Sequence, residues 1–89
     1  MVKVHFTSNL RRHVDCPMVE TAGVTVRDIL DQAFAQNPRL GTYVLDDQGH
    51  VRKHMRILVD GKAIRDLEKQ TDAVLPASEV WVMQALSGG

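Results

Sequence analysis

Cysteine, aromatic side chains and excess charge of either sign are scarce in this 89-residue sequence. Cys16 is the only cysteine, so an intramolecular disulfide is excluded and a reducing cellular interior is the simplest setting. Eleven basic side chains balance eleven acidic ones. The zero net charge argues against nucleic acid or an anionic membrane as the main partner, because both select a clear positive excess. We therefore expect a cytoplasmic protein with neither partner.

Long hydrophobic runs are also missing. No apolar stretch approaches the roughly 20 residues of a membrane-spanning helix. Residues 1–6 alternate in polarity, where a secretion signal would be continuously apolar. Apolar residues make up 44% of the chain and charged residues 25%, values typical of globular domains. At this length we expect one domain built around one small core.

Five segments show the pattern or the composition of β-strands. Apolar and polar residues alternate in 2–7 and again in 54–59, which is the period of a half-buried strand. Asp60-Gly61 follows the second segment and predicts a tight hairpin turn with a short return strand. The predicted strands are 2–7, 18–21, 54–59, 62–64 and 79–85, the last of them rich in β-favouring residues.

The clearest helix begins after Thr25. Threonine is a good N-cap, and Asp28 stands three positions later, as in a capping box. Apolar residues then recur at helical spacing on one face: Val26, Ile29, Leu30, Ala33 and Phe34. Pro38 ends the helix near residues 35–37, because the residue before a proline disfavours the α region. One amphipathic helix packed across one mixed sheet would close a small core, which is an α+β architecture.

The chain ends in Gly88-Gly89, its most unusual feature. At an average glycine usage of about 7%, two final glycines arise by chance in roughly 0.5% of sequences. Glycine carries no Cβ, so a glycine backbone can enter a channel too narrow for any side chain. An ordinary terminus gains nothing from this property. A chain whose own C-terminal carboxylate is the reactive group benefits, because a terminus without side chains can enter the active site of an enzyme.

The order strand, strand, helix, strand, short strand, strand, ending in Gly-Gly, resembles the ubiquitin-like β-grasp and, more closely, the MoaD/ThiS sulfur-carrier family. The similarity is most specific over residues 76–89 and includes the helix start at 25–30. It implies a mixed four- to five-stranded sheet with one main helix packed across it. It also implies a β-grasp domain over 1–85 and a flexible C-terminal tail over 86–89. Family members usually have Asp-Gly-Asp before the last strand, where this chain has Ala-Ser-Glu at 77–79, a change in turn chemistry.

The resemblance implies that the chain is a carrier and not an enzyme. In the family, a MoeB/ThiF-like adenylating enzyme uses ATP to convert the terminal carboxylate, here that of Gly89, into an acyl-adenylate. A sulfur donor then replaces AMP, and the resulting thiocarboxylate delivers sulfur to a biosynthetic enzyme. Such a carrier binds no metal or cofactor itself and is a monomer when free. Gly88 and Ser87 would give the terminus clearance, and Leu86 would be the last residue to dock on a partner.

A partner must also bind the folded domain. If the two valines of the last strand face the helix, Trp81 and Met83 point to the opposite sheet face, because side chains alternate along a strand. In a β-grasp the neighbouring strand 54–59 would add Leu58 to this apolar patch and Arg56 to its positive rim. The predicted partner-binding residues are therefore Leu86, Met83, Trp81, Leu58 and Arg56. The alternative is that Trp81, the only tryptophan, belongs to the core.

Other motifs give weaker evidence of a functional site. Cys16 has no evident helix N-terminus or cationic neighbour, which favours a structural thiol over a nucleophile. The four histidines lack the paired spacing of a metal site. Two other functions stay open at this point. One is a ubiquitin-like modifier joined through Gly89 to lysines, and the other is a non-catalytic β-grasp interaction module with an inert tail.

Overall fold

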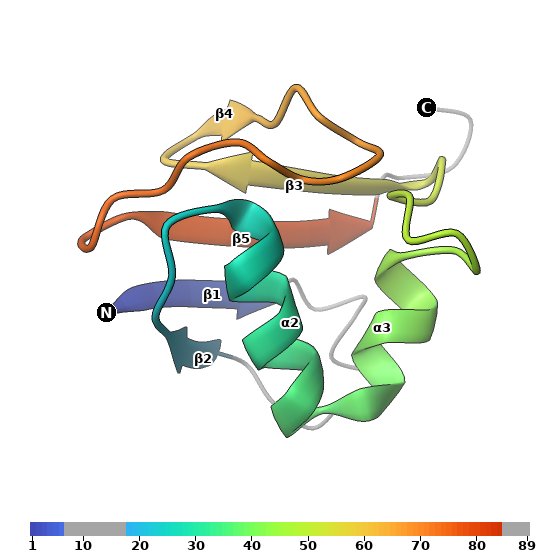
Figure 1. Cartoon of the computed structure of the whole chain (residues 1–89), viewed down its shortest axis with the longest axis horizontal. Helices are drawn as coiled ribbons and strands as arrows, with labels where there is room; N and C mark the ends of the chain where they lie inside the picture. The colour runs from blue at the N-terminus through green and yellow to red at the C-terminus, as the bar shows by residue number, and fades with distance from the viewer. Residues whose placement is uncertain (7–17, 85–89) are drawn as a thin grey trace.

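The computed structural model describes residues 1–6 and 18–84 of the chain (Figure 1). The described strands are β1 (Val2–Phe6), β2 (Met18–Thr21), β3 (Met55–Val59), β4 (Lys62–Ala63) and β5 (Glu79–Gln84), and the described helices are α2 (Val26–Gln36) and α3 (Pro38–Val44). Within these residues no helix is long and apolar enough to cross a membrane.

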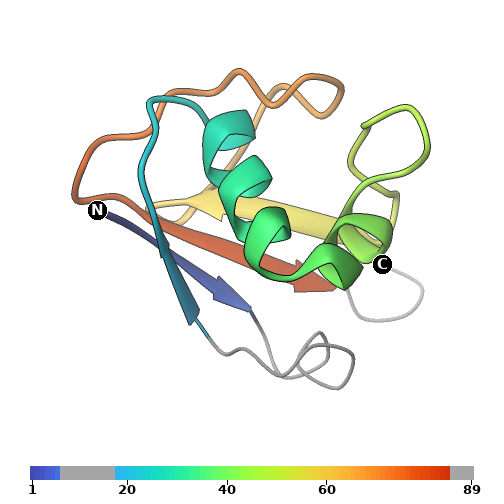
Figure 2. The same ribbon diagram turned by 60° about the horizontal axis from the view of Figure 1, so that its bottom comes forward.

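The strands form one mixed sheet in the order β2-β1-β5-β3-β4. β1 and β5 are parallel, and the other neighbouring strands are antiparallel. Both helices lie on one face of the sheet, as Figure 2 shows, and α2 crosses it. This arrangement confirms the predicted α+β class and the β-grasp, with the full five strands.

The core lies between α2 and the inner face of the sheet. Four residues of the predicted apolar stripe of α2 are completely buried, namely Val26, Ile29, Leu30 and Ala33. Phe34, the fifth, is half-buried against the core. From the sheet, every second residue of β1 and β5 points inward: Val2, Val4, Phe6, Val80 and Val82. The apolar face of α2 and the inward-facing residues of the strands therefore pack together in one apolar layer.

The ends of α2 match their local signals. The Thr25 Oγ1 accepts a hydrogen bond from the Asp28 amide at 3.2 Å, and the Asp28 carboxylate accepts one from the Thr25 amide at 3.3 Å. Together they form the predicted capping box. The helix ends at Gln36, with Asn37 as its C-cap before Pro38.

Helix α3 was not predicted from the sequence, which indicated one main helix. Pro38 ends α2 and also occupies the first turn of α3, where its missing N–H costs no hydrogen bond. Leu40 and Val44, four residues apart, are both completely buried. Two buried apolar positions in seven residues give too weak a periodicity to detect a helix from sequence.

The β3–β4 hairpin follows the prediction closely. Asp60 and Gly61 both have positive φ angles, 50° and 85°, as a type I′ turn requires. The observed strands are slightly shorter than predicted, since β3 begins at Met55 and β4 ends at Ala63. The Ile64 amide still donates to the Ile57 carbonyl at 3.0 Å, so the pairing continues beyond β4. Of the predicted last strand 79–85, residue 85 lies outside the described residues.

A loop between β4 and β5 is organised around the Asp66 carboxylate. Its oxygens accept hydrogen bonds from the Thr71 hydroxyl at 2.6 Å and from the amides of Glu68, Lys69 and Thr71. These donors, the Thr71 hydroxyl first, lower the pKa of Asp66 from 3.8 to about 2. Because the folded-state pKa lies below the ordinary value, the ionised carboxylate stabilises the fold above about pH 4, and the contribution is lost as the pH falls toward 2.

We therefore expect Asp66→Asn to lower the free energy of unfolding at neutral pH, and the difference from wild type to shrink as the pH falls from about 5 to about 2. Urea denaturation across this pH range measures both variants. Asp47→Asn, which removes an exposed carboxylate from another loop, is the matched control. A difference between wild type and Asp66→Asn that stays constant with pH would contradict the assignment.

Candidate functional site

The last strand, β5, lies in the centre of the sheet between β1 and β3. Its last described residue, Gln84, pairs with Met55 at the start of β3. The tail sequence follows directly from this end of the strand. The predicted tail 86–89, with Leu86, Ser87, Gly88 and Gly89, lies outside the described residues, so the roles given to these residues stay predictions.

Side chains along β5 alternate between the two faces of the sheet. Val80 and Val82 are completely buried against the helix side. Trp81 is 39% exposed on the opposite face, which excludes the core position considered for it. Met83 is half-buried on the same face as Trp81. The structure therefore places both side chains where the sequence predicted, and their role in binding stays a prediction.

One row of residues crosses the whole outer face of the sheet through Trp81. His5 pairs with Met18 on one side and with Trp81 on the other. Trp81 pairs with Leu58, and Leu58 pairs with Ala63. We call these five residues the outer row. Because every member except His5 is apolar, the outer row forms an apolar strip across all five strands, with exposed residues at both of its ends.

His5 was missed as a site residue, since the sequence treats it as an isolated surface histidine. Its ring stacks on the Trp81 indole, with ring centroids 4.3 Å apart and an interplanar angle of 16°. Its Nε2 lies 2.9 Å from Oε1 of Glu79, which fixes the orientation of the imidazole. One face of the indole is thereby covered and held, which pre-organises Trp81 as a rigid contact. The alternation of side chains in β1 and β5, which directs both His5 and Trp81 to the outer face, was the signal in the sequence that could have identified His5.

Charges border the outer row on both sides. Arg56 pairs with Met83 on the side from which the tail sequence continues, and its side chain is exposed. On the other side, Lys3 pairs with Glu20 and with Glu79. The positive rim that the sequence predicted is therefore found at Arg56, whereas the opposite border is mixed in sign. Partner residues facing Arg56 would need negative charge.

The shifted pKa values in the described part of the chain have structural causes. Backbone hydrogen bonds from His50 and Gln48 hold the pKa of Asp46 below its ordinary value. Asp46 and Asp66 each organise a loop and lie apart from the outer row. Among residues 1–6 and 18–84, no three His, Cys, Asp or Glu side chains gather in a group that could hold a metal ion.

Comparison with known proteins identifies the family and the fold. The sequence matches the ThiS family over residues 4–89. No curated protein matches the chain significantly. The solution structure of small archaeal modifier protein 1 from Methanosarcina acetivorans is similar, with 26% identity and a TM-score of 0.82, and the match covers 99% of this chain and 95% of that protein.

Two further structures share the fold at lower identity. The crystal structure of the Amycolatopsis orientalis BexX/CysO complex matches at 20% identity with a TM-score of 0.85, covering 100% of both chains. The crystal structure of Mycobacterium tuberculosis CysO matches at 19% identity with a TM-score of 0.83, covering 97% of this chain and 100% of CysO.

Proposed function

The chain belongs to the ThiS family, and on this premise we propose that it is a sulfur carrier whose reactive group is the Gly89 carboxylate. The observation that carries the proposal is that the family match extends through the last residue, Gly89. A match confined to the folded domain would support the fold alone. A match that includes the terminal Gly-Gly supports chemistry at the terminus.

The reaction starts with activation of the carboxylate, which is a poor electrophile as it stands. A carboxylate oxygen of Gly89 attacks the α-phosphorus of ATP, pyrophosphate leaves, and an acyl-adenylate forms on the chain. Hydrosulfide then attacks the acyl carbon, the bond to the AMP oxygen breaks, and a thiocarboxylate remains with release of AMP and a proton. The thiocarboxylate sulfur is a nucleophile that a biosynthetic acceptor enzyme can use. A MoeB/ThiF-like adenylating enzyme would bind the ATP and catalyse the first step.

The fold contributes to this reaction by positioning the C-terminal tail. β5 is hydrogen-bonded on both sides, so the strand that leads to the tail is held in the sheet. The five residues after Gln84 reach at most about 3.3–3.6 Å each when fully extended. A partner that holds the terminus must therefore lie close to the end of β5. The outer row, with Met83 and Arg56 beside it, is the neighbouring surface that such a partner would contact.

A second candidate function is protein modification, in which the activated Gly89 carbonyl forms an isopeptide bond with a target lysine. It is favoured by the similarity to a protein named as a small archaeal modifier, the match at 26% identity. Both functions share the adenylation step, and they differ in the nucleophile that displaces AMP. A non-catalytic interaction module would use neither step.

Intact mass measurement separates the three functions. The full chain is incubated with the adenylating enzyme of the same organism, ATP and sulfide. We expect one oxygen-to-sulfur exchange in the chain, located at Gly89 by fragmentation. Adducts of high mass on other proteins of a cell extract would instead identify a modifier. An unchanged mass in both experiments would contradict activation of the terminus and leave the interaction module.

A further inference from the structure

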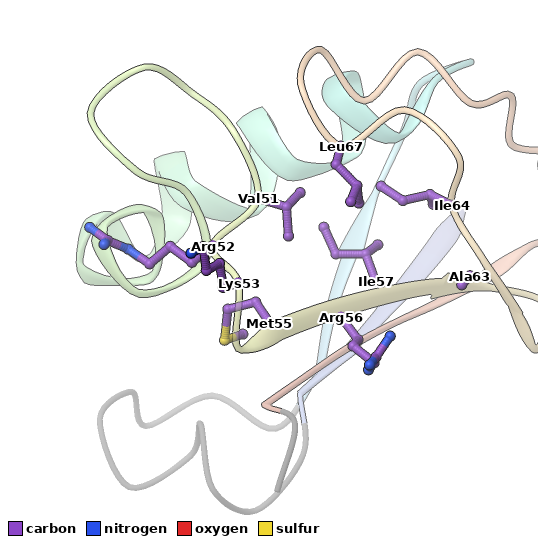
Figure 3. Close-up of a pocket in the computed structure, with 9 residues that line it drawn as sticks. All are labelled: Val51, Arg52, Lys53, Met55, Arg56, Ile57, Ala63, Ile64 and Leu67. Atoms are coloured by element: carbon purple, nitrogen blue, oxygen red, sulfur yellow. The ribbon is translucent and has the colours of Figure 1, made fainter. Parts of the chain in front are cut away.

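A groove of about 250 Å³ lies between β3 and the loop that follows β4 (Figure 3). Figure 3 shows the apolar side chains of Val51, Ile57, Ile64 and Leu67 pointing toward one another across it. The floor is buried, with Ile57 1% and Ile64 8% exposed, whereas Leu67 at the rim is 50% exposed. The groove therefore offers a partner apolar surface that the chain itself leaves uncovered.

Hydrogen bonds hold the walls of this groove in place. The Val51 amide donates to the Leu67 carbonyl at 2.8 Å, which joins the two sides. The same carbonyl accepts a hydrogen bond at 2.9 Å from Nε2 of Gln70, a completely buried side chain. Gln70 in turn accepts a hydrogen bond at 3.0 Å from Arg27 of α2. The groove is thus formed before any partner arrives, which lowers the cost of binding.

The charge around the groove has one sign. Three of its lining residues are cations, Arg52, Lys53 and Arg56, and none is an acid. Figure 3 shows Arg52 and Lys53 at one end and Arg56 directed away from the apolar cluster. Between residues 52 and 65 the chain has five of its eleven cations, at 52, 53, 56, 62 and 65, and a single acid, Asp60. This concentration of positive charge stands out in a chain of zero net charge.

Three acids that follow β3 in the sequence are engaged within the chain. The Asp60 carboxylate accepts hydrogen bonds from the Ser78 hydroxyl at 2.9 Å and from the Glu79 amide at 3.0 Å. The Asp72 carboxylate accepts from the amides of Arg65 and Asp66, and Asp66 itself has the donors described above. Among residues 1–6 and 18–84, none of these carboxylates forms an ion pair with the cations of the groove. Arg52 is engaged within the chain, because its Nε donates to the Thr42 carbonyl at 2.8 Å, whereas Lys53 and Arg56 are available to negative groups of a partner.

The size and position of the groove indicate what kind of group it receives. Pockets for small-molecule ligands are about 300–1,000 Å³, so a groove of about 250 Å³ suits one or two side chains better than a cofactor. Met55 lines the groove and also pairs with Gln84, the residue from which the tail sequence continues. β4 pairs only with Leu58 and Val59, so β4 does not cover the first half of β3 beside the groove. The opening of the groove therefore lies beside the end of the strand from which the tail sequence continues.

We propose that the groove docks an extended segment of the partner protein that holds the C-terminal tail, a segment that combines aliphatic and acidic side chains. This inference rests on the proposed function, because it takes the tail as the part that a partner holds. The aliphatic side chains enter between Val51, Ile64 and Leu67, and the carboxylates face Lys53 and Arg56. Ala63 and Arg56 border both the groove and the outer row, whereas Val51, Ile64 and Leu67 line the groove and are not part of the outer row.

Methyl NMR of the full chain tests the site directly. The probe is a short peptide that alternates Asp or Glu with Leu or Val, and the matched control peptide has Asn and Gln in place of the acids. We expect the acidic peptide to shift the methyl signals of Val51, Ile64 and Leu67, with a Kd at least about tenfold lower than the control peptide. Equal affinity for both peptides, or shifts confined to the outer row, would overturn the proposal. So would an oligonucleotide that shifts the same signals more strongly.

Matched variants test whether the partner enzyme binds the groove. Lys53→Glu and Leu67→Asn each change an exposed groove residue, and Lys69→Glu and Leu75→Asn make the same changes at exposed positions outside it. We expect each groove variant to weaken peptide binding about fivefold or more and to raise the KM of the adenylating enzyme for the chain similarly, with the controls within about twofold. If wild type is adenylated and the groove variants match the controls in both measurements, the groove proposal fails and the proposed function stands. If wild type is not adenylated, the proposed function fails, and the peptide titration still decides whether the groove binds acidic segments.

Discussion

Deletion of Gly89 is expected to abolish adenylation of the chain, with kcat/KM falling at least about 100-fold. The reacting carboxylate would then lie up to about 3.3 Å short of its position, and a displacement of about 1 Å from a reactive geometry already costs about 100-fold. Addition of one residue after Gly89 should have the same effect, because the new carboxylate overshoots the α-phosphorus. Pyrophosphate release by the adenylating enzyme measures both variants.

The fold provides the control for these variants. The last described strand pair is Gln84 with Met55, and the core residues lie at or before Val82. Both variants should therefore keep the amide NMR spectrum of residues 1–84 and the unfolding temperature of wild type. A variant that folds normally and is still adenylated at the wild-type rate would rule out the terminal-carboxylate mechanism. Such a result would leave the interaction module as the remaining function.

Replacement of Trp81 by alanine is expected to have the second largest effect, lowering kcat/KM of the adenylating enzyme for the chain about 30-fold. Trp81 is the largest side chain of the outer row and is 39% exposed. A tryptophan in the centre of an interface is worth about 2 kcal/mol or more, which is roughly 30-fold in affinity. The loss should appear mainly in KM, because the role proposed for Trp81 is contact with the partner and not with the reacting atoms.

His5→Ala refines this prediction. Loss of the stacked ring leaves Trp81 free to adopt other rotamers, and ordering its side chain on binding costs about 0.5–1.5 kcal/mol, so the expected decrease in kcat/KM is about 2- to 12-fold. Val24→Ala, at a residue that is 71% exposed and outside the outer row, should leave kcat/KM within about twofold of wild type. If Trp81→Ala behaves like Val24→Ala, the outer row does not contact this enzyme.

Local features of the fold could be predicted because their causes lie within a few residues. The capping box needs only Thr25 and Asp28, and the hairpin turn needs only Asp60 and Gly61. Helix α3 could not be predicted, since its stability comes from burial of Leu40 and Val44 under tertiary contacts and not from a repeated pattern. Element boundaries differ by one residue at β3 and β4 for the same reason, because strand pairing sets them.

By itself, the sequence determined the core stripe of α2, indicated the β-grasp class and the resemblance to the family, and favoured an outward Trp81 without excluding a core position. Each of these follows from periodicity, capping or terminal motifs that are local in the chain. Only the tertiary structure decided that His5 stacks on Trp81 and reaches Glu79, a residue 74 positions away, and that Val51, Ile57 and Leu67 enclose a groove. These contacts depend on the register of the parallel β1–β5 pair and on how the loop after β4 folds back over β3, and no local pattern encodes either of them.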